Sequence, residues 1–252
     1  MKKIKSYKQF IKESESFDYN DMIDYTLLED SSTDEDLKEL CDKAKKLGVK
    51  SVCVLPKFVK LASNCLAESK VLVCTVVSFP GGDNSLDEKI SETKKVIADG
   101  ADEVDMVLNY KMLQLDGETS KEYLVEEVKS LTDICHDNVN KDGEKVILKV
   151  IVESGLLTNE ETEISTHVCI EAGADFIKTS TGKVAVGAEM DKIQTMFDTI
   201  KSEGSSMNIK ASGGIRTAEQ ITSMIGTVDR FGMGFGSVDK INGIISDVES
   251  SY

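Results

Sequence analysis

Short runs of apolar, β-branched residues alternate with longer amphipathic segments along most of the chain. The runs have strand length, and the segments carry apolar residues at helical spacing. The runs predict eight strands, at Met22–Leu28, Ser51–Leu55, Val71–Phe79, Glu103–Asn109, Val146–Glu153, Phe176–Thr181, Asn208–Ser212 and Arg230–Phe235. The segments predict helices at Asp34–Leu47, Leu86–Asp99, Lys121–Asn138, Asn159–Glu171, Met190–Ser202 and Ala218–Ile225.

Residues typical of helix ends support these assignments. Thr33 precedes three acidic residues, and Ser85 lies three residues before Glu88, which is the spacing of a capping box. Glycines, which favour helix termination, fall where several helices should end: Gly48, Gly100, Gly173 and Gly204.

Strand–helix alternation predicts a parallel sheet of the α/β class. An open, doubly wound sheet is the alternative, but eight repeats in 252 residues favour a closed (β/α)8 TIM barrel in a single domain. We expect residues 18–252 to form this barrel. Residues 1–17 are expected to be a polar leader or a short surface helix without an assigned function.

Composition narrows the function classes. A net charge of −15 argues against nucleic acid as a partner, because duplex binding needs a basic surface. No apolar stretch has signal-peptide or membrane-span length, so neither secretion nor membrane association is expected. Six cysteines without a Cys-x-x-Cys pair predict a reducing cytoplasm. The two histidines, His136 and His167, fall in predicted helices, which leaves a metal-dependent mechanism without support.

Charged residues interrupt four otherwise apolar strands. They are Asp105, Lys149, Lys178 and Lys210, on predicted strands four to seven. Barrel strands are buried on both faces, so such a charge is best placed inside the barrel near its open end. We therefore expect the three lysines to converge beside the aspartate.

Converging lysines suit carbonyl chemistry. Burial and like charges both lower the pKa of a lysine, and a neutral amine attacks a carbonyl carbon. Asp105 can pair with a cation or move protons. The alternative is a buried ion-pair network without chemistry. The pattern alone leaves open which of Lys149, Lys178 and Lys210 is the nucleophile.

Glycine-containing turns follow the lysine strands, at 179–183 and 212–217, and a third glycine-rich segment lies at 232–237. Glycines let the backbone approach an anion, and barrels often bind phosphate after strands seven and eight. Each turn alone also fits ordinary loop chemistry. Together, beside the lysines, they favour a phosphate group on the substrate.

From about Asp24 to its end, the chain resembles the 2-deoxy-D-ribose-5-phosphate aldolase family. The motifs that carry the resemblance are Glu-Val-Asp-Met-Val (103–107), Leu-Lys-Val-Ile-Val-Glu (148–153), Phe-Ile-Lys-Thr-Ser-Thr-Gly-Lys (176–183) and Gly-Gly-Ile-Arg-Thr (213–217), with weaker matches at 24–28 and 51–56. The resemblance implies a class I aldolase that needs no metal or other cofactor.

The resemblance also assigns roles. Lys178 would form the imine, Lys210 would lower its pKa, and Asp105 would be the other acid–base group. The products would be acetaldehyde and D-glyceraldehyde 3-phosphate. Four residues match positions that line the family's active site: Asp24, Thr26, Cys53 and Lys149. Those expected to bind the substrate from the phosphate side are Thr181, Gly182, Lys183, Gly213, Gly214, Arg216, Gly236 and Ser237.

Three positions allow more than one interpretation: Cys53, Tyr252 and Gly234. Cys53 lacks a histidine partner, which favours a substrate-lining or core thiol over a nucleophile. Tyr252 ends the chain, and the resemblance implies either a tail that assists proton transfer in the active site or a frayed terminus. Gly234 stands where the family usually has a phosphate-binding serine. This departure keeps open another class I aldolase or transaldolase acting on a different sugar phosphate. A non-enzymatic phosphate-binding barrel is a separate alternative. A homodimer is an expectation that the sequence does not decide.

Overall fold

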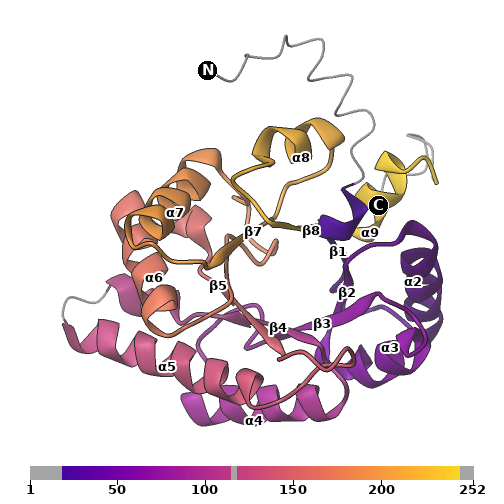
Figure 1. Ribbon diagram of the computed structural model, residues 1–252, viewed down its shortest axis with the longest axis horizontal. Helices are drawn as coiled ribbons and strands as arrows, with labels where there is room; N and C mark the ends of the chain where they lie inside the picture. The colour runs from indigo at the N-terminus through magenta and orange to yellow at the C-terminus, as the bar shows by residue number, and fades with distance from the viewer. Residues whose placement is uncertain (1–18, 115–117, 245–252) are drawn as a thin grey trace.

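A computed structural model describes residues 19–114 and 118–244, and its eight strands form one closed parallel barrel. Each strand pairs with the next in chain order, and the first pairs with the last. Seen along the barrel, the strands form a central ring with helices outside it (Figure 1). The strands are β1 (Ile23–Leu27), β2 (Ser51–Val54), β3 (Leu72–Val77), β4 (Glu103–Val107), β5 (Ile147–Ile151), β6 (Phe176–Lys178), β7 (Asn208–Ser212) and β8 (Arg230–Gly234).

The connecting helices cover the outside of this ring. Capping boxes begin four of them, at Thr33, Ser85, Thr158 and Thr217, so the first two confirm the sequence prediction. The helices are α2 (Asp34–Leu47), α3 (Val59–Leu66), α4 (Leu86–Ala98), α5 (Glu118–His136), α6 (Asn159–Glu171), α7 (Met190–Ser202), α8 (Ala218–Met224) and α9 (Phe235–Ile241). Short 3-10 turns lie at Asn20–Met22, Pro56–Phe58, Tyr110–Gln114 and Ser154–Leu156.

The barrel prediction is confirmed, and the errors concern element ends and two short helices. The predicted strand Phe176–Thr181 ends at Lys178, because the residues after it turn away to form a loop. Two helices were missed. α3 begins at Val59, and its N-cap residue, Phe58, makes no side-chain cap. α9 begins in the glycine-rich segment that was interpreted as a loop. Residues 1–17, the predicted leader, lie outside the described residues.

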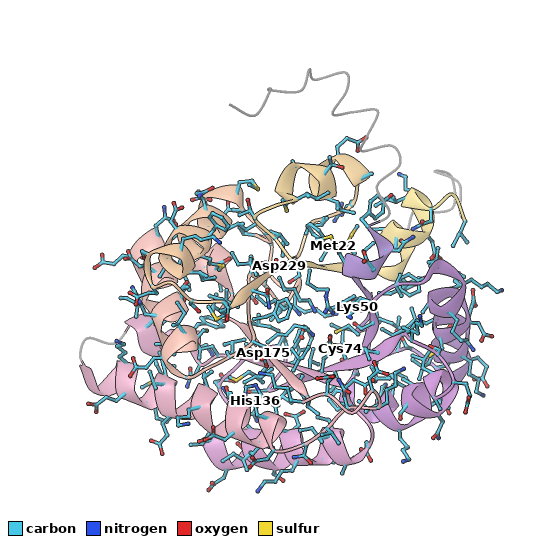
Figure 2. The ribbon with its side chains drawn as sticks, in the orientation of Figure 1. Met22, Lys50, Cys74, His136, Asp175 and Asp229 are labelled. Atoms are coloured by element: carbon cyan, nitrogen blue, oxygen red, sulfur yellow. The ribbon has the colours of Figure 1, made fainter. Side chains whose placement is uncertain are left out.

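Apolar side chains of helices and strands fill the layer between ring and helices, and side chains also occupy the space inside the ring (Figure 2). A second, smaller apolar cluster holds Cys53, Cys74 and Val76. Among the helices in the described ranges, none is both long enough and apolar enough to cross a membrane.

Candidate active site

Four neighbouring strands bring the predicted charges together inside the barrel. In the register, Lys149 of β5 lies opposite Asp105 of β4. Lys178 of β6 lies opposite both Ile151 of β5 and Lys210 of β7. Lys149 is therefore two residues further from the carboxyl ends of the strands than Lys178, which places it one layer deeper in the barrel.

Asp105 is the centre of the cluster. Lys178 Nζ and Lys210 Nζ each donate a hydrogen bond of 2.7 Å to the same oxygen, Oδ2. Lys149 Nζ donates to the other oxygen, Oδ1, at 2.9 Å. The Cys74 thiol also donates to Oδ1, at 3.2 Å. One carboxylate thus holds three amines within a few ångströms of each other, and all four charged residues are buried.

A second layer of charge lies beneath this centre. Lys210 also pairs with Asp24, and Lys149 also pairs with Glu103 at 2.7 Å. Arg230 of β8 donates to Asp24 at 2.6 Å and to Glu103 Oε2 at 3.0 Å. The sequence interpretation did not single out Arg230 or Glu103, although a charge at the first position of an apolar strand was a signal for both. Each cation in this layer is matched by carboxylates, as buried charges require.

Attraction between these groups sets the direction of their pKa shifts. Burial raises the pKa of Asp105, but Lys149, Lys178 and Lys210 outweigh burial and hold it well below its usual range. Burial lowers the pKa of Lys210, but attraction by Asp105 and Asp24 raises it overall. The pKa of Lys149 also lies well above its ordinary value, because attraction by Asp105 and other acidic groups outweighs the effect of burial. The expectation that burial and like charges lower the pKa of the lysines is therefore wrong for Lys149 and Lys210, because carboxylates outweigh both effects.

Lys178 differs from the other two lysines in its surroundings. Within the described ranges, Asp105 is the one carboxylate at ion-pair distance from it, whereas Lys210 has two and Lys149 has three. The Lys178 side chain is 4% exposed, while those of Lys149 and Lys210 are fully buried. Lys178 is thus the least restrained of the three amines and the closest to the barrel mouth.

The loops after β6 and β7 approach each other through glycines. Gly182, Gly213 and Gly214 all have positive φ values, which favour glycine over other residues. The Ala188 N–H donates to the Gly213 carbonyl at 3.0 Å, and a Cβ on Gly187 would lie only 2.2 Å from that oxygen. The sequence interpretation missed Gly187. The two loops predicted to bind phosphate therefore share one edge of the barrel mouth.

The charged residues of these loops are exposed. Lys183 pairs with Glu29, after β1, at 3.1 Å, and Arg216 lies exposed before α8. Thr181 is buried, and its hydroxyl donates to Glu153 Oε2 at 2.5 Å, while its backbone N–H lies 3.3 Å from both Glu153 oxygens. Glu153 follows β5 with φ 52°, a conformation uncommon for residues other than glycine. The sequence analysis placed Glu153 at the end of a predicted strand and gave it no role.

The remaining predicted positions are spread around the mouth. Cys53 is buried opposite Thr26 in the register of β1 and β2, and the half-buried Thr26 hydroxyl donates to the Asp24 carbonyl at 2.9 Å. Gly236 and Ser237 lie in the first turn of α9, instead of in the loop that was predicted there. Tyr252 lies outside the described residues.

Within residues 19–114 and 118–244, two groups of side chains have donor atoms close enough for a metal ion. They are Cys53, Cys74 and Asp105, and Asp24, Cys74 and Glu103. The carboxylates in both groups already pair with Lys149, Lys210 or Arg230. Amines at hydrogen-bond distance repel a cation and occupy its oxygen ligands, so the donor set fits an amine cluster better than a metal site.

The fold and the site together define a (β/α)8-barrel enzyme whose interior amines and carboxylate suit carbonyl chemistry. Residues 20–238 match the model of the DeoC/LacD family aldolases. The chain is 42% identical over 207 residues to the deoxyribose-phosphate aldolase of Mycoplasmoides pirum, covering 82% of this chain and 89% of that protein. It is 43% identical over 203 residues to that of Caldicellulosiruptor saccharolyticus, covering 81% and 87%.

Solved structures agree with the sequence matches. A deoxyribose phosphate aldolase from Aeropyrum pernix, described as a tetramer, superposes with a TM-score of 0.78 at 26% identity, covering 95% of this chain and 98% of that one. An aldolase called QR15 gives 0.79 at 34% identity, covering 90% and 96%. The chain belongs to the DeoC/LacD family of aldolases, which are carbon–carbon lyases.

Proposed function

We propose that this protein is a class I aldolase that reversibly cleaves 2-deoxy-D-ribose 5-phosphate to acetaldehyde and D-glyceraldehyde 3-phosphate, in deoxyribose phosphate catabolism. The observation that carries the proposal is the shared hydrogen bonding of Lys178 and Lys210 to one oxygen of Asp105. Lys178 has fewer carboxylate partners than Lys210 and is slightly exposed where Lys210 is fully buried, which supports its role as the nucleophilic amine.

The reaction proceeds through a covalent imine. Neutral Lys178 Nζ attacks the C1 aldehyde carbon, and loss of water from the carbinolamine leaves a protonated imine. A base removes the 3-hydroxyl proton, the C2–C3 bond breaks, and its electrons move into the imine to form an enamine. D-Glyceraldehyde 3-phosphate leaves. Protonation of the enamine at C2 and hydrolysis of the imine then release acetaldehyde and restore the amine.

Asp105 and Lys210 are the acid–base groups of this sequence. The pKa of Asp105 lies well below its usual range, because three lysines outweigh its burial, so it is a carboxylate at neutral pH, the form that a base requires. Lys210 has a raised pKa and remains an ammonium that donates them. The proposal needs no metal or organic cofactor, because the protonated imine is the electron sink.

We assign substrate binding to the surrounding positions. Asp24, Thr26, Cys53 and Lys149 border the reacting carbons, with the two loops after β6 and β7 at the phosphate. Backbone N–H groups of the glycine turns can approach a phosphate closely. A cytoplasmic site, a homodimer and a role for Tyr252 remain predictions from the sequence.

Reduction with borohydride in the presence of acetaldehyde tests the imine. Wild type should gain one adduct, and peptide mapping should place it on Lys178. Lys210→Met, which removes an equally buried lysine, should still form the adduct, whereas Lys178→Met should not. An unmodified Lys178 in active wild type would refute the mechanism.

A second candidate function is cleavage of a different sugar phosphate by the same imine chemistry. Gly234 favours this alternative, because a family serine is absent from the phosphate side. A panel of sugar phosphates, with coupled detection of glyceraldehyde 3-phosphate, separates the two functions. Thermal stabilisation by sugar phosphates without any turnover would instead indicate a binding protein.

A further inference from the structure

Two cysteines face each other beside the catalytic carboxylate. Cys53 of β2 and Cys74 of β3 are register partners on neighbouring parallel strands, so their side chains share the inner face of the barrel. Their sulfur atoms and an oxygen of Asp105 all lie within 4.8 Å of one another. Both cysteines are free and buried. Cys74, labelled in Figure 2, also lies 3.3 Å from Lys149 Nζ.

The positions of this pair suit a covalent link. Neighbouring strands lie about 4.8 Å apart, within the range of about 4.4–6.8 Å that separates the Cα atoms of most disulfides. Register partners such as Cys53 and Cys74 therefore have their backbones at a spacing that a disulfide can bridge.

The two thiols differ in character. The contact with Cys74 lowers the pKa of Cys53 against its burial, with help from Lys210 and Lys178. Burial raises the pKa of Cys74 well above its ordinary value, and its contact with Cys53 adds to the effect. Cys53 is thus the better nucleophile, and Cys74 is a protonated partner positioned to resolve an oxidised Cys53.

We propose that Cys53 and Cys74 form an oxidisable dithiol in the active site, which a hydroperoxide such as hydrogen peroxide converts to a disulfide. The Cys53 thiolate attacks one peroxide oxygen and the O–O bond breaks. Hydroxide departs as the leaving group, and Cys53 becomes a sulfenic acid. The Cys74 sulfur then attacks the Cys53 sulfur, the S–O bond breaks, and the Cys74 proton leaves with the oxygen as water. In sum, two thiols are oxidised to one disulfide and one peroxide is reduced to two waters.

The surroundings favour oxidation over metal capture at this pair. Lys149, Lys178 and Lys210 all donate to Asp105, the carboxylate next to both thiols. The ammonium groups of Lys149 and Lys210 repel a divalent cation but stabilise a thiolate. Hydrogen peroxide is no larger than the small aldehyde that the proposed reaction releases, so the barrel mouth can admit both.

The disulfide would interfere with the proposed chemistry. Cys74 donates to Asp105 Oδ1 as a thiol, and a disulfide has no proton to donate. Asp105 would lose this partner, and the linked sulfurs would move away from Lys149. We expect reversible inhibition of the aldolase; this effect rests on the proposed function, whereas the disulfide itself does not.

The chain contains a matched control pair. Cys41 of α2 and Cys65 of α3 are also hydrogen-bonded thiols, but they lie among the outer helices. Trypsin cuts after lysines that separate all four cysteines. Cys53 and Cys74 fall in fragments 51–57 and 71–89, and Cys41 and Cys65 fall in 39–43 and 61–70.

The experiment oxidises the full-length protein with hydrogen peroxide, blocks free thiols, and maps tryptic fragments without reduction. We expect fragments 51–57 and 71–89 to be cross-linked. Activity should fall about tenfold or more, because an acid–base carboxylate is perturbed. Dithiothreitol should restore it. The Cys65→Ala variant should keep both basal activity and this response.

The Cys74→Ala and Cys74→Ser variants test the resolving step. Each should give no cross-link, and dimedone should label Cys53 in them far more than in wild type. Oxidised wild type without the cross-link, or equal dimedone labelling in wild type and both variants, would overturn the proposal. Because the cross-link is read by mass, a missing disulfide is distinguishable from a wrong assignment of the aldolase activity.

Discussion

Lys178 and Lys210 donate hydrogen bonds to the same atom, Asp105 Oδ2, each at 2.7 Å. The two amines are not equivalent, because Lys210 is also paired with Asp24. This asymmetry supports the proposed roles of Lys178 as the nucleophile and Lys210 as its neighbouring cation, independently of sequence resemblance.

Replacing Lys210 should slow the reaction without abolishing the imine. In Lys210→Met, the acid partner is lost while Lys178 remains, so kcat for deoxyribose 5-phosphate should fall by about 10²–10⁴. Stopped-flow trapping with borohydride should still place an adduct on Lys178. The exposed Lys57→Met is the control and should match wild type. Unchanged kcat in Lys210→Met would remove Lys210 from the acid–base chemistry.

Asp24 should stabilise the fold in a pH-dependent manner. Burial raises its pKa, but Arg230, Lys210 and Lys149 lower it overall, below the unfolded value of 3.8. A depressed folded-state pKa contributes stability above pH 3.8, and this contribution is lost as pH falls toward the folded value. Asp24→Asn should therefore cost about 3–5 kcal/mol at pH 7, because it leaves buried cations unmatched.

Urea unfolding of wild type and Asp24→Asn across a pH series measures this effect. The stability difference should shrink below about pH 4, where the unfolded wild type takes up a proton at this position. Asp30→Asn, at an exposed site, should track wild type at every pH. A difference between wild type and Asp24→Asn that stays constant to acid pH would contradict the proposed linkage.

The sequence predicted those features that repeat along the chain. Apolar strands with single charges indicated the barrel and placed Lys149, Lys178 and Lys210 inside it, because a charge buried on both sides has few alternatives. The pKa directions of Lys149 and Lys210 were mispredicted, because they depend on Asp105 and then on Asp24 and Glu103. The distances of these carboxylates to the lysines follow from strand register and not from spacing along one strand.

Features created by contacts between distant loops were not predictable. Gly187 has no local signal, and its need for glycine arises from the carbonyl of Gly213 across the mouth. Glu153 gains its role only when Thr181 folds over it. α9 was missed because Phe235, Gly236 and Ser237 are typical of a turn, and the helix is stabilised by packing of Val238 against the core.

Glu153 should position the phosphate-side loop through Thr181. Glu153→Ala removes the acceptor of the Thr181 hydroxyl and N–H, a loss of about 1–3 kcal/mol in hydrogen bonding. We expect KM for deoxyribose 5-phosphate to rise about tenfold, with a smaller change in kcat. Turnover of unphosphorylated deoxyribose should be little affected. The exposed Glu160→Gln is the control.

The left-handed backbone of Glu153 allows a structural role to be separated from a positioning role. Glu153→Gly relieves a backbone cost of about 1 kcal/mol, so this variant should be more stable than Glu153→Ala. Both variants should nevertheless show the raised KM. If KM recovered in Glu153→Gly along with stability, the effect of Glu153 would be structural and not a matter of holding Thr181.

Gly234 should accept a serine and gain a phosphate contact. An added Cβ there would meet no atom within 4 Å, and the backbone φ of −58° is open to any residue. Gly234 is also the N-cap of α9 and makes no side-chain cap, so a serine hydroxyl can serve both the helix and an anion. We expect Gly234→Ser to lower KM for deoxyribose 5-phosphate severalfold and to raise stability by a few tenths of a kcal/mol.

Gly234→Ala carries the same Cβ without the hydroxyl and is the matched control. If the ratio of activities on phosphorylated and unphosphorylated deoxyribose is the same in both variants, the hydroxyl does not reach the phosphate, and the backbone N–H groups of the loops after β6 and β7 hold it instead.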